Sequence, residues 1–183
     1  DNPFTREDAC EALGLDKNKK IILSVGGSLG ARTINESILE NVDFFKEKDI
    51  QLIWQTGKWF YEKAVESIGN ENYPNLKIFD FISRMDLAYA SADIIISRAG
   101  ALAISELCLA GKPTILIPSP NVSEDHQTKN AMSLVNKNAA IMVRDAEAKV
   151  ELIKELNSLL DDNEKQVTLS NNCKALGIPN ATD

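Results

Sequence analysis

Residues 93–120 read DIIISRAGALAISELCLAGKPTILIPSP, in which two apolar runs flank a helical pattern. The run Asp93–Ser97 is apolar at successive positions, which is typical of a strand buried on both faces of a parallel sheet. The helical pattern Ala101–Ala110 follows and stops at Gly111, a residue type that favours helix C-termini. A second apolar run, Thr114–Pro118, comes next. The stretch therefore predicts a strand–helix–strand unit of a parallel sheet.

The same alternation extends along the rest of the chain. Further strands are expected at Ile21–Val25, Gln51–Trp54, Leu76–Phe79 and Ala140–Val143. Further helices are expected at Ala31–Leu39, Lys58–Ile68, Arg84–Ala90 (capped by Ser83), His126–Asn136 and Val150–Leu160. The sequence predicts an α/β fold of Rossmann type, with a doubly wound, parallel, six-stranded sheet.

The bulk composition fits one domain with a real core, since the chain has 183 residues. Its 20 basic and 27 acidic side chains give a net charge of −7, which argues against a nucleic-acid partner. The three cysteines are widely spaced and indicate neither a disulfide framework nor a zinc site. No apolar run approaches the ~18 residues that span a bilayer, and no signal peptide is present, so we expect a cytoplasmic domain.

A glycine-rich turn, GGSLGA at residues 26–31, follows the first expected strand and opens a helix. Glycines let the backbone approach a ligand, and a helix N-terminus offers N–H groups to a phosphate. Ser28 adds a hydroxyl donor. The spacing fits neither a P-loop nor the dinucleotide fingerprint, and WQTG at residues 54–57 lacks the acid that a nicotinamide enzyme uses. Anion binding and a ligand-free tight turn both remain open from this pattern.

A second turn of this kind, SRAGALAISE, covers residues 97–106. Arg98 can neutralise a phosphate with its planar fork of donors. Glu106 can accept hydrogen bonds from the two hydroxyls of a ribose, because a carboxylate has two accepting oxygens. An acid near a helix start is also favoured by the helix dipole alone, so the residue pattern leaves both interpretations of Glu106 open.

Two more segments follow strand ends. DHQTKN at residues 125–130 contains His126, the only histidine, and Gln127, which can donate and accept to sugar hydroxyls. A polar helix start explains both residues equally well. In FDFISRM at residues 79–85, backbone groups could contact a base edge and Met85 could pack on its ring. Alone, that segment indicates only a strand running into a capped helix.

Taken together and in this order, these segments resemble the C-terminal half of the MurG family of GT-B glycosyltransferases. The resemblance rests on GGSLGARTINES (26–37), IWQTGK (53–58), the segment from Asp80 to Pro120, and DHQTKNAMSLV (125–135). It implies one of two Rossmann-like domains, with residues 1–18 holding part of a linker and a first helix. Residues 175–183 resemble the approach to the family's final helix, and the acceptor domain is expected to be absent from this chain.

The resemblance also implies roles for individual residues in binding UDP-N-acetylglucosamine. The Ile82 backbone is expected to contact uracil, with Phe81 and Met85 nearby. Glu106 is expected to bind the ribose hydroxyls. The diphosphate is expected to lie among Gly27, Ser28, Arg98 and the amides of Ala101, Leu102 and Ala103. His126 and Gln127 are expected beside the sugar.

Three positions bear on how closely the family pattern is followed. Ala103 stands where the family often has threonine, which removes one hydroxyl beside the phosphates. His126 stands where many members have glutamine. Arg6 is compared with a family linker arginine that lies near the phosphates.

The family reaction moves N-acetylglucosamine, with inversion, from UDP-N-acetylglucosamine to lipid I and yields lipid II for peptidoglycan. The resemblance implies no cofactor and no metal, and it places the acceptor-activating base and the lipid I site in the missing half. No catalytic residue is therefore expected in this chain, which alone should catalyse little or nothing. The complete protein is expected at the cytoplasmic face of the bacterial inner membrane.

Two alternatives stay open. The chain could be a nucleotide-sugar-binding subunit that works with a separate partner chain. It could also come from another GT-B enzyme, such as a glycolipid synthase, which would prefer a galactosyl donor. An epimerase is disfavoured, because the catalytic acids and further histidine that it needs are not found.

Overall fold

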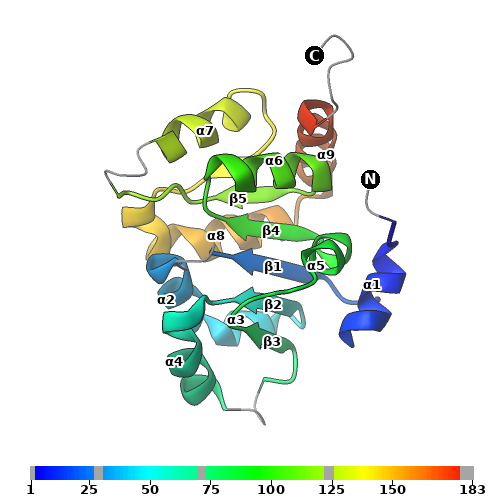
Figure 1. Cartoon of the computed structure of the whole chain (residues 1–183), viewed down its shortest axis with the longest axis vertical. Coiled ribbons are helices and arrows are strands. Elements are labelled where there is room, and N and C mark those ends of the chain that lie inside the picture. Colours follow the sequence, from blue (N-terminus) through cyan, green and yellow to red (C-terminus); the bar gives the residue numbers. More distant parts are fainter. Residues whose placement is uncertain (1–2, 27–30, 70–72, 122–125, 178–183) are drawn as a thin grey trace.

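Within the described residues, 3–26, 31–69, 73–121 and 126–177, six parallel strands form one sheet in the order β3-β2-β1-β4-β5-β6. In this computed structural model all the strands point the same way (Figure 1). The strands are β1 (Ile21–Val25), β2 (Gln51–Gln55), β3 (Leu76–Phe79), β4 (Ile94–Ser97), β5 (Thr114–Leu116) and β6 (Ile141–Met142). The predicted fold class is thereby confirmed.

Helices cover both faces of the sheet. They are α1 (Arg6–Leu13), α2 (Arg32–Glu40), α3 (Val42–Glu47), α4 (Lys58–Ile68), α5 (Met85–Ser91), α6 (Ala101–Ala110), α7 (His126–Val135), α8 (Ala148–Leu160) and α9 (Asn163–Gly177), with a 3-10 turn, η2 (Asp145–Glu147), before α8. The apolar sides of α2, α3, α4 and α8 share one core cluster, and those of α1, α5, α6 and α7 share the other. Helix α9 contributes to both clusters.

The central strands are buried on both faces, which explains their continuous apolar runs. In β4, Ile94 and Ile96 enter one core cluster while Ile95 enters the other, and all three are fully buried. Such alternation follows from the two-residue period of a strand. The covalent state of the cysteines also agrees with the sequence, since Cys10, Cys108 and Cys173 are free and buried.

Helix starts and ends differ from the prediction in a few places. Helix α5 begins at Met85, not at Arg84, and its N-cap is Arg84, without a side-chain cap. The prediction that Ser83 caps this helix is therefore wrong. The Arg84 guanidinium instead pairs with Asp86 in the first helical turn, at 3.0 Å, where an acid is favoured by the helix dipole.

Two helices, α3 and α9, were not predicted. Helix α9 buries Leu169 and Cys173, which lie four residues apart on one face, amid polar residues. So narrow an apolar stripe gives little periodic signal. No described helix combines the length and apolar character needed to cross a membrane.

Candidate functional site

A cleft of about 650 Å³ opens where the parallel strands end, beside the point between β1 and β4 at which the strand order reverses. Open parallel sheets bind ligands at this position. We call it the β1–β4 cleft. Its described lining residues are Val25, Gly26, Ala31, Arg32, Phe81, Met85, Tyr89, Ser97, Arg98, Gly100, Leu102, Ala103, Glu106, Ser119, Asn121 and Gln127. The four segments singled out from the sequence, 26–31, 79–85, 97–106 and 125–130, therefore each contribute described residues to this one cleft.

Glu106 forms part of the cleft wall and is held by a tyrosine. The Tyr89 hydroxyl on α5 donates to Glu106 Oε2 at 2.9 Å. Burial, and then the adjacent carboxylate, raise the pKa of Tyr89, so this hydroxyl stays a donor. A carboxylate offers about four lone-pair sites, so one hydrogen bond leaves accepting capacity for a ligand. The pair is thus an oriented acceptor for hydroxyl groups.

Helix α6 starts directly at the cleft. Its N-cap is Gly100, which provides no side-chain cap, and its first turn carries no acid. The first N–H groups of a helix have no carbonyl partner within that helix. The amides of Ala101, Leu102 and Ala103 therefore form a positive end at the same helix that carries Glu106. This arrangement suits an anion next to a diol.

Arg98 lines the cleft, but its Nη1 is hydrogen-bonded to groups outside the described cleft lining. Its Nη1 donates to Asp145 Oδ1 at 2.6 Å and to the carbonyls of Ile117 and Pro118 at 3.2 Å. The Thr33 hydroxyl donates to the other Asp145 oxygen at 3.0 Å. This network joins the segments after β4 and β5 to η2 and to the first turn of α2. The Asp145 carboxylate largely offsets the positive charge of Arg98. The contribution of Arg98 to the cleft is therefore mainly a set of oriented N–H donors.

Helix α7 fixes the turn before α6. The Gln127 side-chain oxygen accepts from the amides of Ala99, at 3.1 Å, and Ser119, at 2.9 Å. Asn130 Nδ2 donates to the Ala99 carbonyl at 3.0 Å. Gln127 thus holds the loops after β4 and β5 together while it lines the cleft. Its expected contact with a sugar stays a prediction.

The segment after β3 presents two side chains to the cleft. Phe81 is exposed and Met85 half-buried, and both line the cleft wall. Ile82 is buried, and its backbone N–H donates to Gln55 Oε1 at 2.8 Å. A base could accept a hydrogen bond from the Ile82 N–H only if the bond from this N–H to Gln55 were broken. The expected uracil contact of Ile82 stays a prediction.

The remaining predicted residues lie as follows. Ala101 and His126 are exposed at the first residues of α6 and α7, and neither belongs to the described cleft lining. Gly27 and Ser28 lie outside the described residues. The comparison of Arg6 with a phosphate-side arginine is wrong. Arg6 pairs with Asp93 at 2.8 Å, next to the amino ends of β1 and β4 and at the edge opposite the cleft.

Three residues that hold the candidate site together, Tyr89, Thr33 and Asp145, were not predicted from the sequence. Tyr89 lies one helical turn after Met85, so the four-residue spacing could have placed it on the cleft side of α5. Thr33 and Asp145 gave no local signal, because they meet across 112 positions of sequence. Among the described residues, no group of three or more His, Cys, Asp or Glu side chains is placed to hold a metal ion.

Comparison with known proteins adds an independent finding. Residues 21–183 match the model of the glycosyltransferase family 28 C-terminal domain. The chain is 49% identical over 180 residues to a Parabacteroides distasonis protein named UDP-N-acetylglucosamine–N-acetylmuramyl-(pentapeptide) pyrophosphoryl-undecaprenol N-acetylglucosamine transferase, covering 97% of this chain and 48% of that protein. A Flavobacterium psychrophilum protein of the same name is 50% identical, with 97% and 47% covered.

A solved structure shows the same relationship. The crystal structure of Acinetobacter baumannii MurG matches with a TM-score of 0.78 and 31% identity, over 98% of this chain and 51% of that one. The prediction of one half of a GT-B glycosyltransferase is therefore confirmed. The chain spans about half the length of the curated relatives it matches.

Proposed function

We propose that this chain, which belongs to the glycosyltransferase family 28 C-terminal domain family, holds UDP-N-acetylglucosamine in the β1–β4 cleft as the donor half of a transferase. The observation that carries the proposal is the start of α6. One short helix offers uncapped amides at its N-terminus and, about one and a half turns later, a carboxylate held by Tyr89. An anion and a vicinal diol are what a nucleotide diphosphate presents.

The donor would lie along the cleft in a definite order. The base would pack near Phe81 and Met85, and the ribose hydroxyls would bond to Glu106. The diphosphate would meet the α6 amides and the remaining donors of Arg98. The sugar would then lie toward Gln127 and the start of α7. This order follows the lining of the cleft from α5, across α6, to α7.

The chemistry required of this half is charge stabilisation. In the proposed inverting step, an acceptor hydroxyl forms a bond to the anomeric carbon while the bond to the UDP oxygen breaks. The electron pair leaves with UDP, so negative charge grows on the diphosphate. Amides fixed at a helix start stabilise that charge without reorganising. We propose that no metal or other cofactor takes part. We also propose that the base that removes the acceptor proton lies on the other half of the complete enzyme.

The acceptor and the membrane belong to the wider proposal. The names of the relatives describe transfer to an undecaprenol-linked, pentapeptide-bearing sugar. We assign this lipid, lipid I, to the half of the protein that the chain does not cover. The complete enzyme would then work at the cytoplasmic face of the inner membrane and make lipid II for peptidoglycan, with no nucleic-acid partner.

The proposed function is tested by calorimetric titration of this chain with UDP-N-acetylglucosamine, UDP-galactose and UDP, each with and without EDTA. We expect the N-acetylglucosamine donor to bind about tenfold more tightly than the galactosyl donor, a difference of about 1.4 kcal/mol. EDTA should leave the affinity unchanged. The chain alone should not turn over a lipid acceptor, because the base is elsewhere.

Other results would redirect the assignment. Preference for UDP-galactose would favour a glycolipid synthase. Turnover restored only by a separate polypeptide would favour a two-chain transferase. Absence of binding by all three nucleotides would contradict a preformed donor site in this domain.

A further inference from the structure

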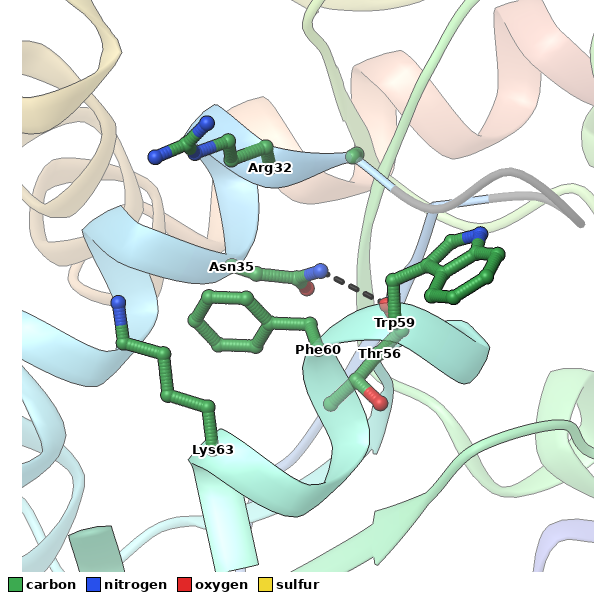
Figure 2. Close-up of a pocket in the computed structure, with 7 residues that line it drawn as sticks. Arg32, Asn35, Thr56, Trp59, Phe60 and Lys63 are labelled. Atoms are coloured by element: carbon green, nitrogen blue, oxygen red, sulfur yellow. Dashed lines mark hydrogen bonds between the residues drawn. The ribbon is translucent and has the colours of Figure 1, made fainter.

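A second pocket, of about 290 Å³, lies between α2 and α4 (Figure 2). We call it the α2–α4 pocket. Its lining residues are Ala31, Arg32, Asn35, Thr56, Trp59, Phe60 and Lys63. Nothing in the donor site described above uses Trp59, Phe60 or Lys63. The pocket therefore calls for an explanation of its own.

The two sides of the pocket differ in character. Figure 2 shows the ends of Arg32 and Lys63 on one side, the Trp59 indole on the other, and the Phe60 ring between them. Trp59 is 83% exposed, which is unusual for the largest apolar side chain. Phe60 packs against the buried Trp54, so this part of the wall is fixed. A ligand would meet an aromatic surface and a cationic side together.

The charges around the pocket favour an anion. Its charged lining residues, Arg32 and Lys63, are both basic. Arg32 pairs through Nε with Glu36, but that carboxylate is shared with Lys149 at 3.0 Å. Helix α4 starts at the pocket after Gly57, without a side-chain cap and without an acid in its first turn. The helix start adds a positive end to the two basic side chains.

The polar floor of the pocket is already used internally. Asn35 Nδ2 donates to the Thr56 carbonyl at 2.8 Å, as Figure 2 shows, and Asn35 Oδ1 accepts from Trp54 Nε1 at 2.9 Å. Both residues are buried. The floor is therefore a rigid support, and recognition would come from the basic and aromatic walls.

The pocket adjoins the donor cleft, because Ala31 and Arg32 line both. A group bound in the pocket would thus lie close to a donor bound in the cleft. The acceptor named for the relatives carries a pentapeptide. Five extended residues reach at most about 17 Å, and any free peptide ends in a carboxylate. An acceptor sugar placed at the cleft could therefore extend its peptide into the neighbouring pocket.

We propose that the α2–α4 pocket binds the anionic end of the acceptor's peptide, with its carboxylate at Lys63 and Arg32 and its apolar part against Trp59 and Phe60. This inference rests on the proposed function. It assigns this half of the enzyme a contact with the acceptor as well as with the donor.

The chain carries its own reporter for the test. Trp59 is exposed and the other tryptophan, Trp54, is fully buried, so a ligand in the pocket should change mainly the Trp59 emission. The probe is N-acetyl-pentaalanine with a free C-terminal carboxylate, compared with the same peptide as its amide. We expect saturable fluorescence change with a dissociation constant on the order of 1 mM, and binding about fivefold weaker for the amide.

Variants locate the contact. Lys63→Gln should weaken binding of the free-acid peptide about fivefold and leave binding of the amide nearly unchanged. Lys154→Gln changes an exposed lysine of α8 that pairs with Glu151 and does not line the pocket; it makes the same charge change and should have no effect. Trp59→Phe should remove the fluorescence response. UDP-N-acetylglucosamine binding, measured by calorimetry on each variant, should stay within about twofold of the parent.

Four outcomes would overturn the inference. The first two are the absence of a saturable fluorescence response to the peptide and equal affinity for the free-acid peptide and its amide. The other two are a fluorescence response that persists in Trp59→Phe and binding of inorganic diphosphate, but not of the peptide, in the pocket. Any of these with intact UDP-N-acetylglucosamine binding would leave the donor site standing. If the unaltered chain did not bind UDP-N-acetylglucosamine, the result would instead count against the proposed function.

Discussion

Replacing Glu106 with alanine is expected to weaken binding of UDP-N-acetylglucosamine about 100-fold. In the proposed complex, this carboxylate accepts from both ribose hydroxyls, and hydrogen bonds to a charged group contribute about 1.5 kcal/mol or more each. Losing two such bonds costs about 3 kcal/mol, which corresponds to roughly 100-fold in affinity. Calorimetric titration of the variant measures the change directly.

Two further variants make this result specific to the carboxylate. Tyr89→Phe removes the hydroxyl that orients Glu106 and should weaken nucleotide binding by a smaller factor, about fivefold. Ser105→Ala, next to Glu106 but outside the described lining, should bind like the parent. If Glu106→Ala kept the parent's affinity, Glu106 would be an acid favoured only by the helix dipole, and the ribose assignment would be wrong.

Replacing Asp145 with alanine is expected to lower the free energy of unfolding by about 2–3 kcal/mol. The side chains of Arg98 and Asp145 are only 15% and 14% exposed, so the change leaves a largely buried guanidinium without its carboxylate. It also removes the acceptor of the Thr33 hydroxyl. For a domain of this size the melting temperature should fall by roughly 5–10 °C, which thermal denaturation followed by circular dichroism will measure.

A matched variant separates charge from hydrogen bonding at this position. Asp145→Asn keeps an acceptor for Arg98 and should cost about 1 kcal/mol. The alanine variant should also bind UDP-N-acetylglucosamine less tightly, because the network positions Arg98 and the turn that leads into α6. An unchanged melting temperature in Asp145→Ala would show that the ion pair does not hold these segments together.

Much of the fold could be predicted because the sequence signals were local. Strands β1 and β3 have the predicted bounds, and a run such as IIIS in β4 is apolar at nearly every position because both faces of the sheet are covered. The Gly111 stop of α6 was also correct, since this residue adopts the left-handed conformation with φ of 64°. Helix α9 escaped prediction because it buries only Leu169 and Cys173 among its described residues.

The site was predictable only in outline. Parallel strands end at one edge, so the segments that follow β3 and β4 were expected at the same edge of the sheet, and Phe81, Arg98 and Glu106 do line one cleft. The partners that fix them were not predictable. Arg98 meets Asp145 across 47 positions, and the Ile82 amide meets Gln55 across 27. Such contacts depend on how whole elements pack, which residue spacing does not encode.

The most direct test of the donor site is a crystal structure of this chain with UDP-N-acetylglucosamine. We expect the ribose hydroxyls within hydrogen-bond distance of Glu106, the diphosphate at the α6 amides beside Arg98, and the base near Phe81 and Met85. A nucleotide bound in the α2–α4 pocket, or in the β1–β4 cleft with its ribose away from Glu106, would contradict the assignment.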